Sequence, residues 1–120
     1  MSPFFLNMLL LLSAFRYLLH YLSQNYTSKI TLNELEKEFK MNKFTLLKKF
    51  KLKMGLSPLD YQMAVRIENS KQLFYTDTPL THIALESGFY DQSHFSHCFK
   101  KYVGVTPGSY KRNNNILQDW

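Results

Sequence analysis

Apolar residues recur along this chain at helical spacing, in segments that are separated by helix-capping residues. Near the N-terminus, Phe15, Leu18, Leu19, Leu22 and Tyr26 follow the i, i+3, i+4, i+7, i+11 spacing of an amphipathic helix. No segment alternates with the two-residue period of a strand. The pattern therefore predicts an all-α protein of about seven helices.

Capping residues locate the helices of the first half. The stretch "TLNE" (31–34) has the form of a capping box and predicts a helix from Leu32 to about Lys40. Asn42 is suited to cap a second helix, and Gly55 to end it in the left-handed conformation.

A serine or threonine followed by proline marks the predicted start of three later helices. Ser57, Thr78 and Thr106 each precede a proline, which is favoured at the first helical position. The predicted helices span about residues 58–74, 79–87, 91–104 and 107–110.

One pattern occurs twice. Residues 50–61 read "FKLKMGLSPLDY" and residues 99–110 read "FKKYVGVTPGSY", and in both a helix ends at glycine before a proline-led helix begins. A short helix and a turn precede each copy, so the sequence predicts a duplicated helix-turn-helix. The expected division is an apolar N-terminal segment (1–13), a first helix-turn-helix subdomain (14–56), a linker helix (57–75), a second helix-turn-helix subdomain (76–113) and a tail (114–120).

The duplicated helices have equivalent apolar and free faces. Three apolar residues share one face of each helix and should be buried; they are Leu46, Phe50 and Met54 in the first and Phe95, Phe99 and Val103 in the second. The opposite faces carry Phe44, Leu47, Lys48 and Lys51 in the first helix and Ser93, Ser96, His97 and Lys100 in the second. A polar, cationic helix face after a tight turn fits insertion into a DNA major groove.

Composition and charge agree with a polyanionic partner, either nucleic acid or an acidic membrane surface. Hydrophobic residues make up 45% of the 120 residues, enough for a core, and the net charge of +6 favours a polyanionic partner. The single cysteine, Cys98, forms no internal disulfide, which favours a reducing cytoplasm. No phosphate-binding glycine loop or nucleophile–base pair is recognisable, so neither an enzyme nor a cofactor is expected.

The stretch "GFYDQSHFSHCFKKYVGVTPGSYK" (88–111) closely resembles the signature of AraC/XylS-type transcription regulators. Ile83-Ala84 and the "Y…RI…LF" positions of residues 61–74 also match that family. The resemblance covers about residues 14–112 and implies two helix-turn-helix subdomains joined by a rigid helix. It further implies a bacterial regulator of the cytoplasm and nucleoid, in most members an activator that contacts RNA polymerase.

The resemblance also assigns contacts to double-stranded DNA, with the recognition helices in two successive major-groove segments. The base-reading residues would be Lys43, Phe44, Leu47 and Lys48 in the first helix and Gln92, Ser93, Ser96 and His97 in the second. Lys51, Lys100, Lys101, Lys111 and Arg112, together with amides at helix starts, would contact phosphates.

The first half departs from the family pattern at three positions. Glu36 stands where a small residue is preferred, Lys40 where a turn glycine is common, and Leu47 where a polar reader is usual. The first reader is therefore expected to be less selective or to rely on thymine methyl groups and phosphates.

Other interpretations stay open at this point. His94, His97 and Cys98 could suggest a metal, but Cys98 should point to the core and no second ligand cluster exists, so no metal is expected. A basic helical module that docks on a partner protein or an anionic membrane is the alternative function. Residues 4–15 resemble the apolar part of a signal peptide but lack a preceding cation. They could instead form a helix that packs on this domain, or end a missing effector-binding and dimerising domain.

Overall fold

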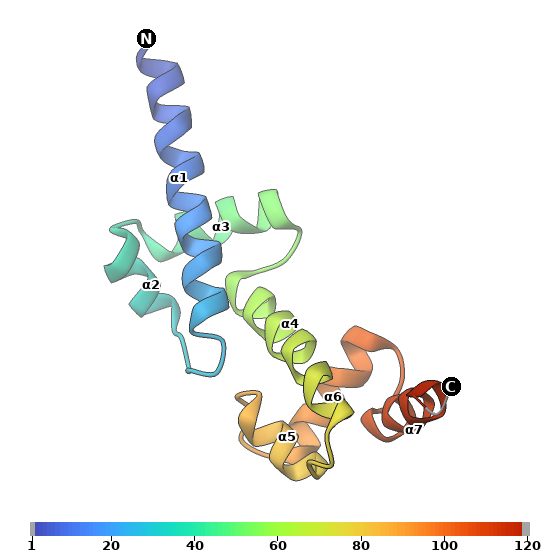
Figure 1. Cartoon of the computed structure of the whole chain (residues 1–120). Coiled ribbons are helices and arrows are strands. Elements are labelled where there is room, and N and C mark those ends of the chain that lie inside the picture. The colour runs from blue at the N-terminus through green and yellow to red at the C-terminus, as the bar shows by residue number, and fades with distance from the viewer. Residues whose placement is uncertain (1, 119–120) are drawn as a thin grey trace. The chain divides into compact units, whose positions relative to one another are not determined.

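The computed structural model describes the backbone of residues 2–118, and their side chains except those of residues 4, 7–11 and 114–118. Its helices, in chain order, are α1 (Pro3–Gln24), α2 (Leu32–Phe39), α3 (Lys43–Met54), α4 (Pro58–Ser70), the 3₁₀ helix Lys71–Tyr75, α5 (Leu80–Glu86), α6 (Gln92–Val103) and α7 (Pro107–Gln118) (Figure 1). The described residues contain no strand, which confirms the all-α prediction.

The chain divides into two compact units. The first comprises Met1–Asn25 and Ile30–Gln62, and the second comprises Tyr26–Lys29 and Met63–Trp120. The boundary falls within α4, and the short segment between α1 and α2 belongs to the second unit.

Most of the predicted helix boundaries are confirmed by cap hydrogen bonds. The hydroxyl of Thr31 accepts from the amide of Glu34 at 3.2 Å, and that of Ser57 accepts from the amide of Asp60 at 3.1 Å. Gly55 and Gly104 end α3 and α6 in the left-handed conformation, with φ of 81° and 96°. Because these caps satisfy amides and carbonyls that a helix end leaves unpaired, they fix where each helix begins and ends.

Four boundaries differ from the sequence-based expectation. The linker helix predicted over residues 58–74 is α-helical only to Ser70 and continues as the 3₁₀ helix Lys71–Tyr75. The helix predicted from Phe15 begins at Pro3, where the Ser2 hydroxyl accepts from the amide of Phe5. Thr78 does not cap α5, because its hydroxyl lies 2.6 Å from that of Thr76 and α5 begins only after Pro79. The last helix continues beyond Tyr110 to Gln118.

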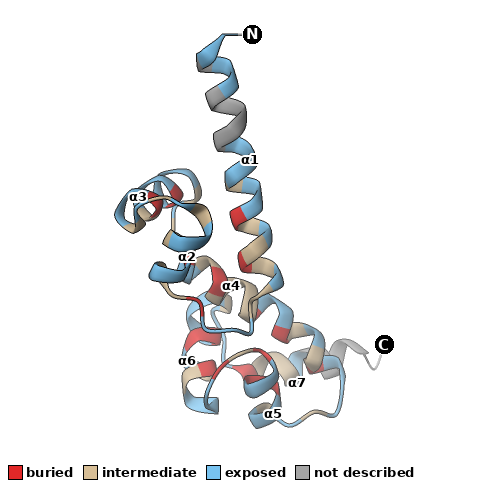
Figure 2. Ribbon diagram, turned by 90° about the vertical axis from the view of Figure 1, so that its left-hand side faces the viewer, coloured by how far each residue is buried: buried red, intermediate tan, exposed pale blue. Residues whose placement is uncertain are grey.

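The core of the first unit lies between α1, α2, α3 and the start of α4. Leu18, Leu22, Leu35, Leu46 and Phe50 are buried together there (Figure 2). The Phe50 ring also contacts Phe15 and Tyr61, with centroid distances of 5.7 and 5.8 Å. The N-terminal part of α1 extends past α2 and α3 in both ribbon views.

The core of the second unit is built around three phenylalanines in contact. Phe74, Phe95 and Phe99 are buried and in mutual ring contact, and Tyr110 of α7 packs edge-on against Phe74 and Phe99. Burying an aromatic side chain removes a large apolar surface from water, so these rings hold α6, α7 and the 3₁₀ helix together.

Two left-handed positions have different surroundings. Lys40, which ends α2, has φ of 50° and is the one non-glycine residue with positive φ in the described chain. Gly88 has φ of +98°, and a Cβ atom there would lie 2.9 Å from the Thr27 Cα and 3.0 Å from Arg66 Nε. Arg66 in turn donates hydrogen bonds to the carbonyls of Tyr26 and Ser28. Gly88 is thus required both by its backbone conformation and by the close approach of the segment that Arg66 binds.

We expect Gly88→Ala to lower the free energy of unfolding by about 3 kcal/mol, since the methyl group adds overpacking to backbone strain. Gly55→Ala is the matched control, because Gly55 has φ of +81° but open space around the Cβ position. It should cost about 1 kcal/mol from strain alone. Urea denaturation of both variants measures the difference, and equal losses would show that the close approach to Thr27 contributes nothing.

Candidate nucleic-acid interface

The first candidate recognition helix, α3, is fixed at both ends and along one face. The Asn42 side-chain oxygen accepts from the amide of Phe44 at 2.9 Å and from that of Thr45 at 3.4 Å. Leu46 and Phe50 are buried, and Met54 is half-buried, as the spacing predicts. Because one face is held in the core, the rotation of α3 about its axis is determined.

The opposite face of α3 is free within its unit. Phe44 keeps 69% of its surface exposed, which is unusual for a phenylalanine, and Leu47 is half-buried. Lys48 and Lys51 are exposed on the same face. An exposed aromatic ring among cations is suited to a partner that has both apolar groups and negative charge.

The start of α3 uses a residue that departs from the family pattern. The Glu36 carboxylate accepts from the backbone amide of Lys43 at 3.0 Å, and the Lys43 ammonium donates to the Asn33 side chain, also at 3.0 Å. With the Asn42 bonds and the bond from the Leu46 amide to the Asn42 carbonyl, all four initial amides of α3 have acceptors. A phosphate at the start of α3 would therefore have to compete with acceptors that these amides already have.

The second candidate helix, α6, is positioned by equivalent residues. Asp91 stands where Asn42 stands in the first copy, and its carboxylate accepts from the His94 amide at 2.7 Å. Phe95 and Phe99 are fully buried, and Val103 is half-buried. The two helices therefore share cap, core and end at a constant offset of 49 residues, as from Phe50 to Phe99.

The opposite face of α6 is polar. On it, Ser93 and His97 are exposed and Ser96 is half-buried, and Gln92 is exposed at the first position of the helix. Within the described residues, the amides of Gln92 and Ser93 have no hydrogen-bond acceptor, in contrast to the first amides of α3. This end of α6 can therefore still donate hydrogen bonds to an anion.

An exposed tyrosine lies next to this face, and the sequence reasoning did not single it out. Tyr90 is 76% exposed and stacks on the His94 ring, with a centroid distance of 4.9 Å and an interplanar angle of 23°. His94 also meets Phe89 edge-on. The sequence signal that could have indicated Tyr90 is an aromatic residue in the turn directly before a candidate recognition helix.

The five predicted phosphate-contacting residues have different surroundings. Lys51, Lys100, Lys101 and Arg112 are exposed, and the Lys101 ammonium lies over the Tyr102 ring. Lys111 is half-buried, and its ammonium donates to the Thr78 carbonyl at 3.3 Å. Four of the five cations are thus directly available to an anionic partner.

The metal and redox interpretations receive no support from the surroundings of Cys98. Its side chain is 7% exposed, and burial raises the pKa of the thiol, so the unreactive protonated form prevails at neutral pH. Among the described residues, no three His, Cys, Asp or Glu side chains gather at a spacing that would hold a metal ion.

Comparison with known proteins identifies the family of this arrangement. A family model described as a helix-turn-helix domain matches residues 35–113, which include both candidate recognition helices. The chain belongs to the AraC-type family of helix-turn-helix transcription regulators. These are DNA-binding regulators, so the resemblance read from residues 88–111 is confirmed.

Similar proteins include both regulators and isolated domains. The HTH-type transcriptional activator RhaS of Yersinia pestis (strain Pestoides F) is 35% identical over 91 residues, which are 75% of this chain and 33% of that protein. The C-terminal domain of AraT, a response regulator from Geobacillus stearothermophilus, superposes with a TM-score of 0.77 at 26% identity and covers 83% of this chain and 84% of that domain. A probable AraC family transcriptional regulator from Rhodopseudomonas palustris gives a TM-score of 0.76 at 25% identity, covering 84% and 96%.

The chain spans about a third of the length of the curated relatives it matches. Across the described residues, no helix combines the length and the apolar character that crossing a membrane requires.

Glu36→Ala should lower the free energy of unfolding by about 1 kcal/mol, because the Lys43 amide loses its acceptor at a helix start. Glu36→Gln is the matched control, since it keeps an acceptor oxygen and should recover about half of that loss. Thermal or urea unfolding followed by circular dichroism measures both. If the two variants lost the same stability, the hydrogen bond to Lys43 would not be what Glu36 contributes.

Proposed function

We propose that this chain is a sequence-specific DNA-binding unit that inserts α3 and α6 into two successive major-groove segments of duplex DNA. The observation that carries the proposal is the equivalence of the two exposed faces. Each lies opposite a buried phenylalanine, Phe50 or Phe99, and each follows a side-chain cap and a tight turn. A helix with one buried and one cationic or polar face is suited to groove insertion.

The exposed face of α6 would read bases by hydrogen bonding. Gln92 can bond to the N6 and N7 edge of adenine, and Ser93, Ser96 and His97 can donate or accept at base edges. The unpaired amides of Gln92 and Ser93 would bind a phosphate, together with Lys100, Lys101 and Arg112. Lys111 would join them if DNA drew its ammonium away from the Thr78 carbonyl.

The exposed face of α3 would read DNA mainly by apolar contact. Phe44 and Leu47 are suited to thymine methyl groups, and Lys48 to guanine O6 and N7. Lys43 reaches a base only after its ammonium leaves Asn33, and Lys51 would contact a phosphate. We therefore expect the α3 half of the site to depend on shape and methyl groups more than on hydrogen bonds.

The wider role follows from the family. RhaS is named a transcriptional activator, so we propose activation through contact with RNA polymerase, in the cytoplasm at the nucleoid. The chain covers a third of that relative, and effector binding or dimerisation would belong to a further domain of a longer regulator. We propose that subdomains 14–56 and 76–113 each carry one recognition helix and that residues 57–75 link them.

Substitutions at base-reading and phosphate-contacting positions should have different effects on the affinity for a duplex that the wild-type protein selects. His97→Ala should weaken binding by about 1–3 kcal/mol and abolish discrimination at one or two base pairs, since a base contact is lost. Lys51→Ala should weaken all sequences equally and reduce the salt slope by about one. Fluorescence anisotropy against single-base variants of the duplex, at several salt concentrations, measures both.

Lys37→Ala is the control, because Lys37 is an exposed cation on α2 outside both proposed reading faces. It should leave discrimination unchanged. If His97→Ala weakened every duplex to the same extent, α6 would not read bases through this residue. If the wild-type protein bound all duplexes alike, sequence-specific recognition itself would be contradicted.

A further inference from the structure

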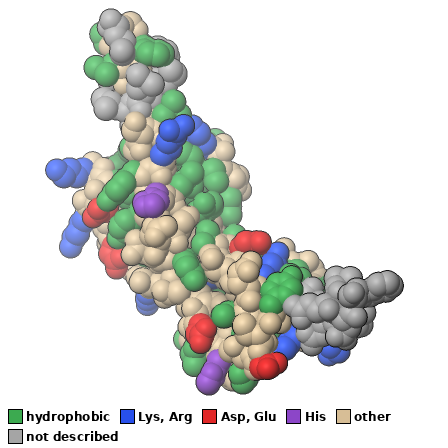
Figure 3. Space-filling model, in the orientation of Figure 1, with side chains coloured by type: hydrophobic (Ala, Val, Ile, Leu, Met, Phe, Trp, Pro, Cys, Tyr) green, Lys and Arg blue, Asp and Glu red, His purple; other side chains and the backbone are tan. Residues whose placement is uncertain are grey.

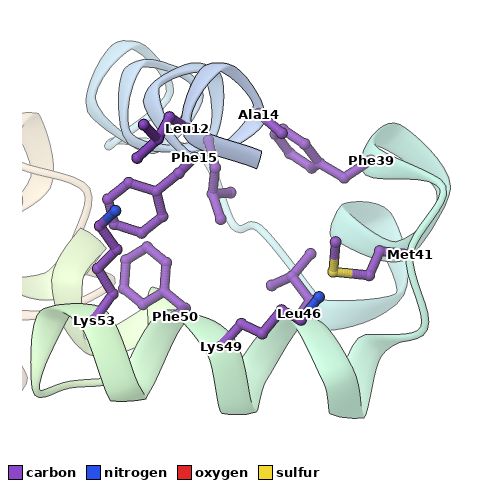
Figure 4. A pocket seen from close by; sticks show the side chains of 10 residues that line it. Leu12, Ala14, Phe15, Phe39, Met41, Leu46, Lys49, Phe50 and Lys53 are labelled. Carbon is purple, nitrogen blue, oxygen red and sulfur yellow. The ribbon is translucent and has the colours of Figure 1, made fainter. Parts of the chain in front are cut away.

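An apolar groove lies in the first unit, between α1 and the side of α3 that faces away from the proposed reading residues. It has a volume of about 320 Å³, and α1, α3 and the end of α2 with the turn after it contribute its ten lining residues (Figure 4). Phe15 and Phe50 face one another along one side, and Phe39 and Met41 lie at the other end. This volume is within the range of small-molecule sites.

The interior of the groove is suited to an apolar body. Phe15 and Phe50 present tilted rings 5.7 Å apart, and Leu18 and Leu46 are buried beside them. Met41 is half-buried and, being unbranched, can adapt to different shapes. An apolar ligand of moderate size would lose contact with water here without displacing any buried polar group.

The rim of the groove is cationic. Lys49 and Lys53 are exposed and lie one turn apart on α3. They border the groove at its two ends, since the Lys53 ammonium lies by Phe15 and the Lys49 side chain points towards Leu46 (Figure 4). The Lys53 ammonium lies 4.8 Å from the centroid of the Phe15 ring, and neither lysine has a carboxylate within ion-pair distance among the described residues. The ten lining residues include no Asp or Glu.

A second hollow on the other side of Phe15 has the same character. It is lined by Leu12, Ser13, Phe15, Arg16, Leu19 and Lys53. In the space-filling view, cationic side chains stand beside apolar surface just below the N-terminal part of α1 (Figure 3). Three cations therefore border the apolar seam between α1 and α3, with no acidic residue in either lining.

We propose that this groove binds an apolar monocarboxylate, with its hydrocarbon body along Phe15 and Phe50 and its carboxylate held at the cationic rim that Lys49 and Lys53 form. Apolar pockets with a few convergent polar groups take ligands whose one charged group sets the orientation. The charge complementarity selects an anion and excludes a cation of the same shape. Because both lysines belong to α3, the ligand would contact the helix that carries Phe44, Leu47 and Lys48, from its other side.

Isothermal titration calorimetry of the full chain without DNA tests this proposal. The probes are sodium 2-naphthoate and sodium decanoate, each paired with the ammonium compound of the same hydrocarbon body. We expect at least one carboxylate to bind one-to-one and at least tenfold more tightly than its ammonium counterpart. The carboxylate that binds more tightly shows whether the natural ligand is an aromatic acid or a fatty acid.

Three variants locate the binding. The double variant Lys49→Gln/Lys53→Gln should weaken the carboxylate about tenfold, because its charge-assisted hydrogen bonds are lost. Lys37→Gln removes a cation outside the groove and should change nothing. Ala14→Phe, at an exposed position of α1 on the groove, should abolish binding while the far-ultraviolet circular dichroism stays that of the wild type.

The proposal is overturned if neither carboxylate binds, or if each ammonium compound binds as tightly as its carboxylate. Unchanged binding by the Lys49→Gln/Lys53→Gln variant would also overturn it, since the ligand would then lie elsewhere. None of these outcomes depends on DNA recognition, so they leave the proposed function to its own test.

Discussion

The burial of one phenylalanine in each of two helices is the constraint on which the rest depends. Phe50 is 1% exposed and Phe99 is fully buried, and each fixes the rotation of its helix by holding one face in a core. Removing such a ring leaves a cavity and costs about 3–5 kcal/mol, so rotations that would withdraw it are strongly disfavoured. The exposure of Phe44, Lys48, Ser93 and His97 follows from that constraint, because they lie on the opposite faces.

The two helices share this geometry but differ in chemistry. At equivalent positions, α3 presents Phe44 and Leu47 where α6 presents Ser93 and Ser96. The helix starts differ too. The Lys43 amide of α3 donates to the Glu36 carboxylate, whereas the equivalent Gln92 amide of α6 has no acceptor among the described residues. Under the proposed function, the duplicated fold serves one polyanionic partner with an apolar reader and a hydrogen-bonding reader at equivalent positions.

Local signals in the sequence predicted much of the fold. Caps such as Thr31, Asn42 and Gly104 act on backbone groups within one helical turn, so the local sequence predicts them. The core faces follow the helical spacing of apolar residues, which the sequence also shows. The contact of Arg66 with the carbonyls of Tyr26 and Ser28 joins residues about 40 positions apart and has no periodic signal. For the same reason Glu36 was recognised only as a departure from a pattern, and its role as an acceptor for α3 required the structure.

The central claim is that α3 and α6 read DNA through equivalent positions 49 residues apart, and a transplanted reader tests it most directly. The variant Lys43→Gln/Phe44→Ser/Leu47→Ser/Lys48→His gives α3 the reading residues of α6 and leaves Leu46 and Phe50 in place. Selection of duplexes from a random pool should yield two short blocks about one helical turn apart for the wild-type protein. For the variant, the first block should become a copy of the second. An unchanged first block, or no enriched sequence for either protein, would contradict the account.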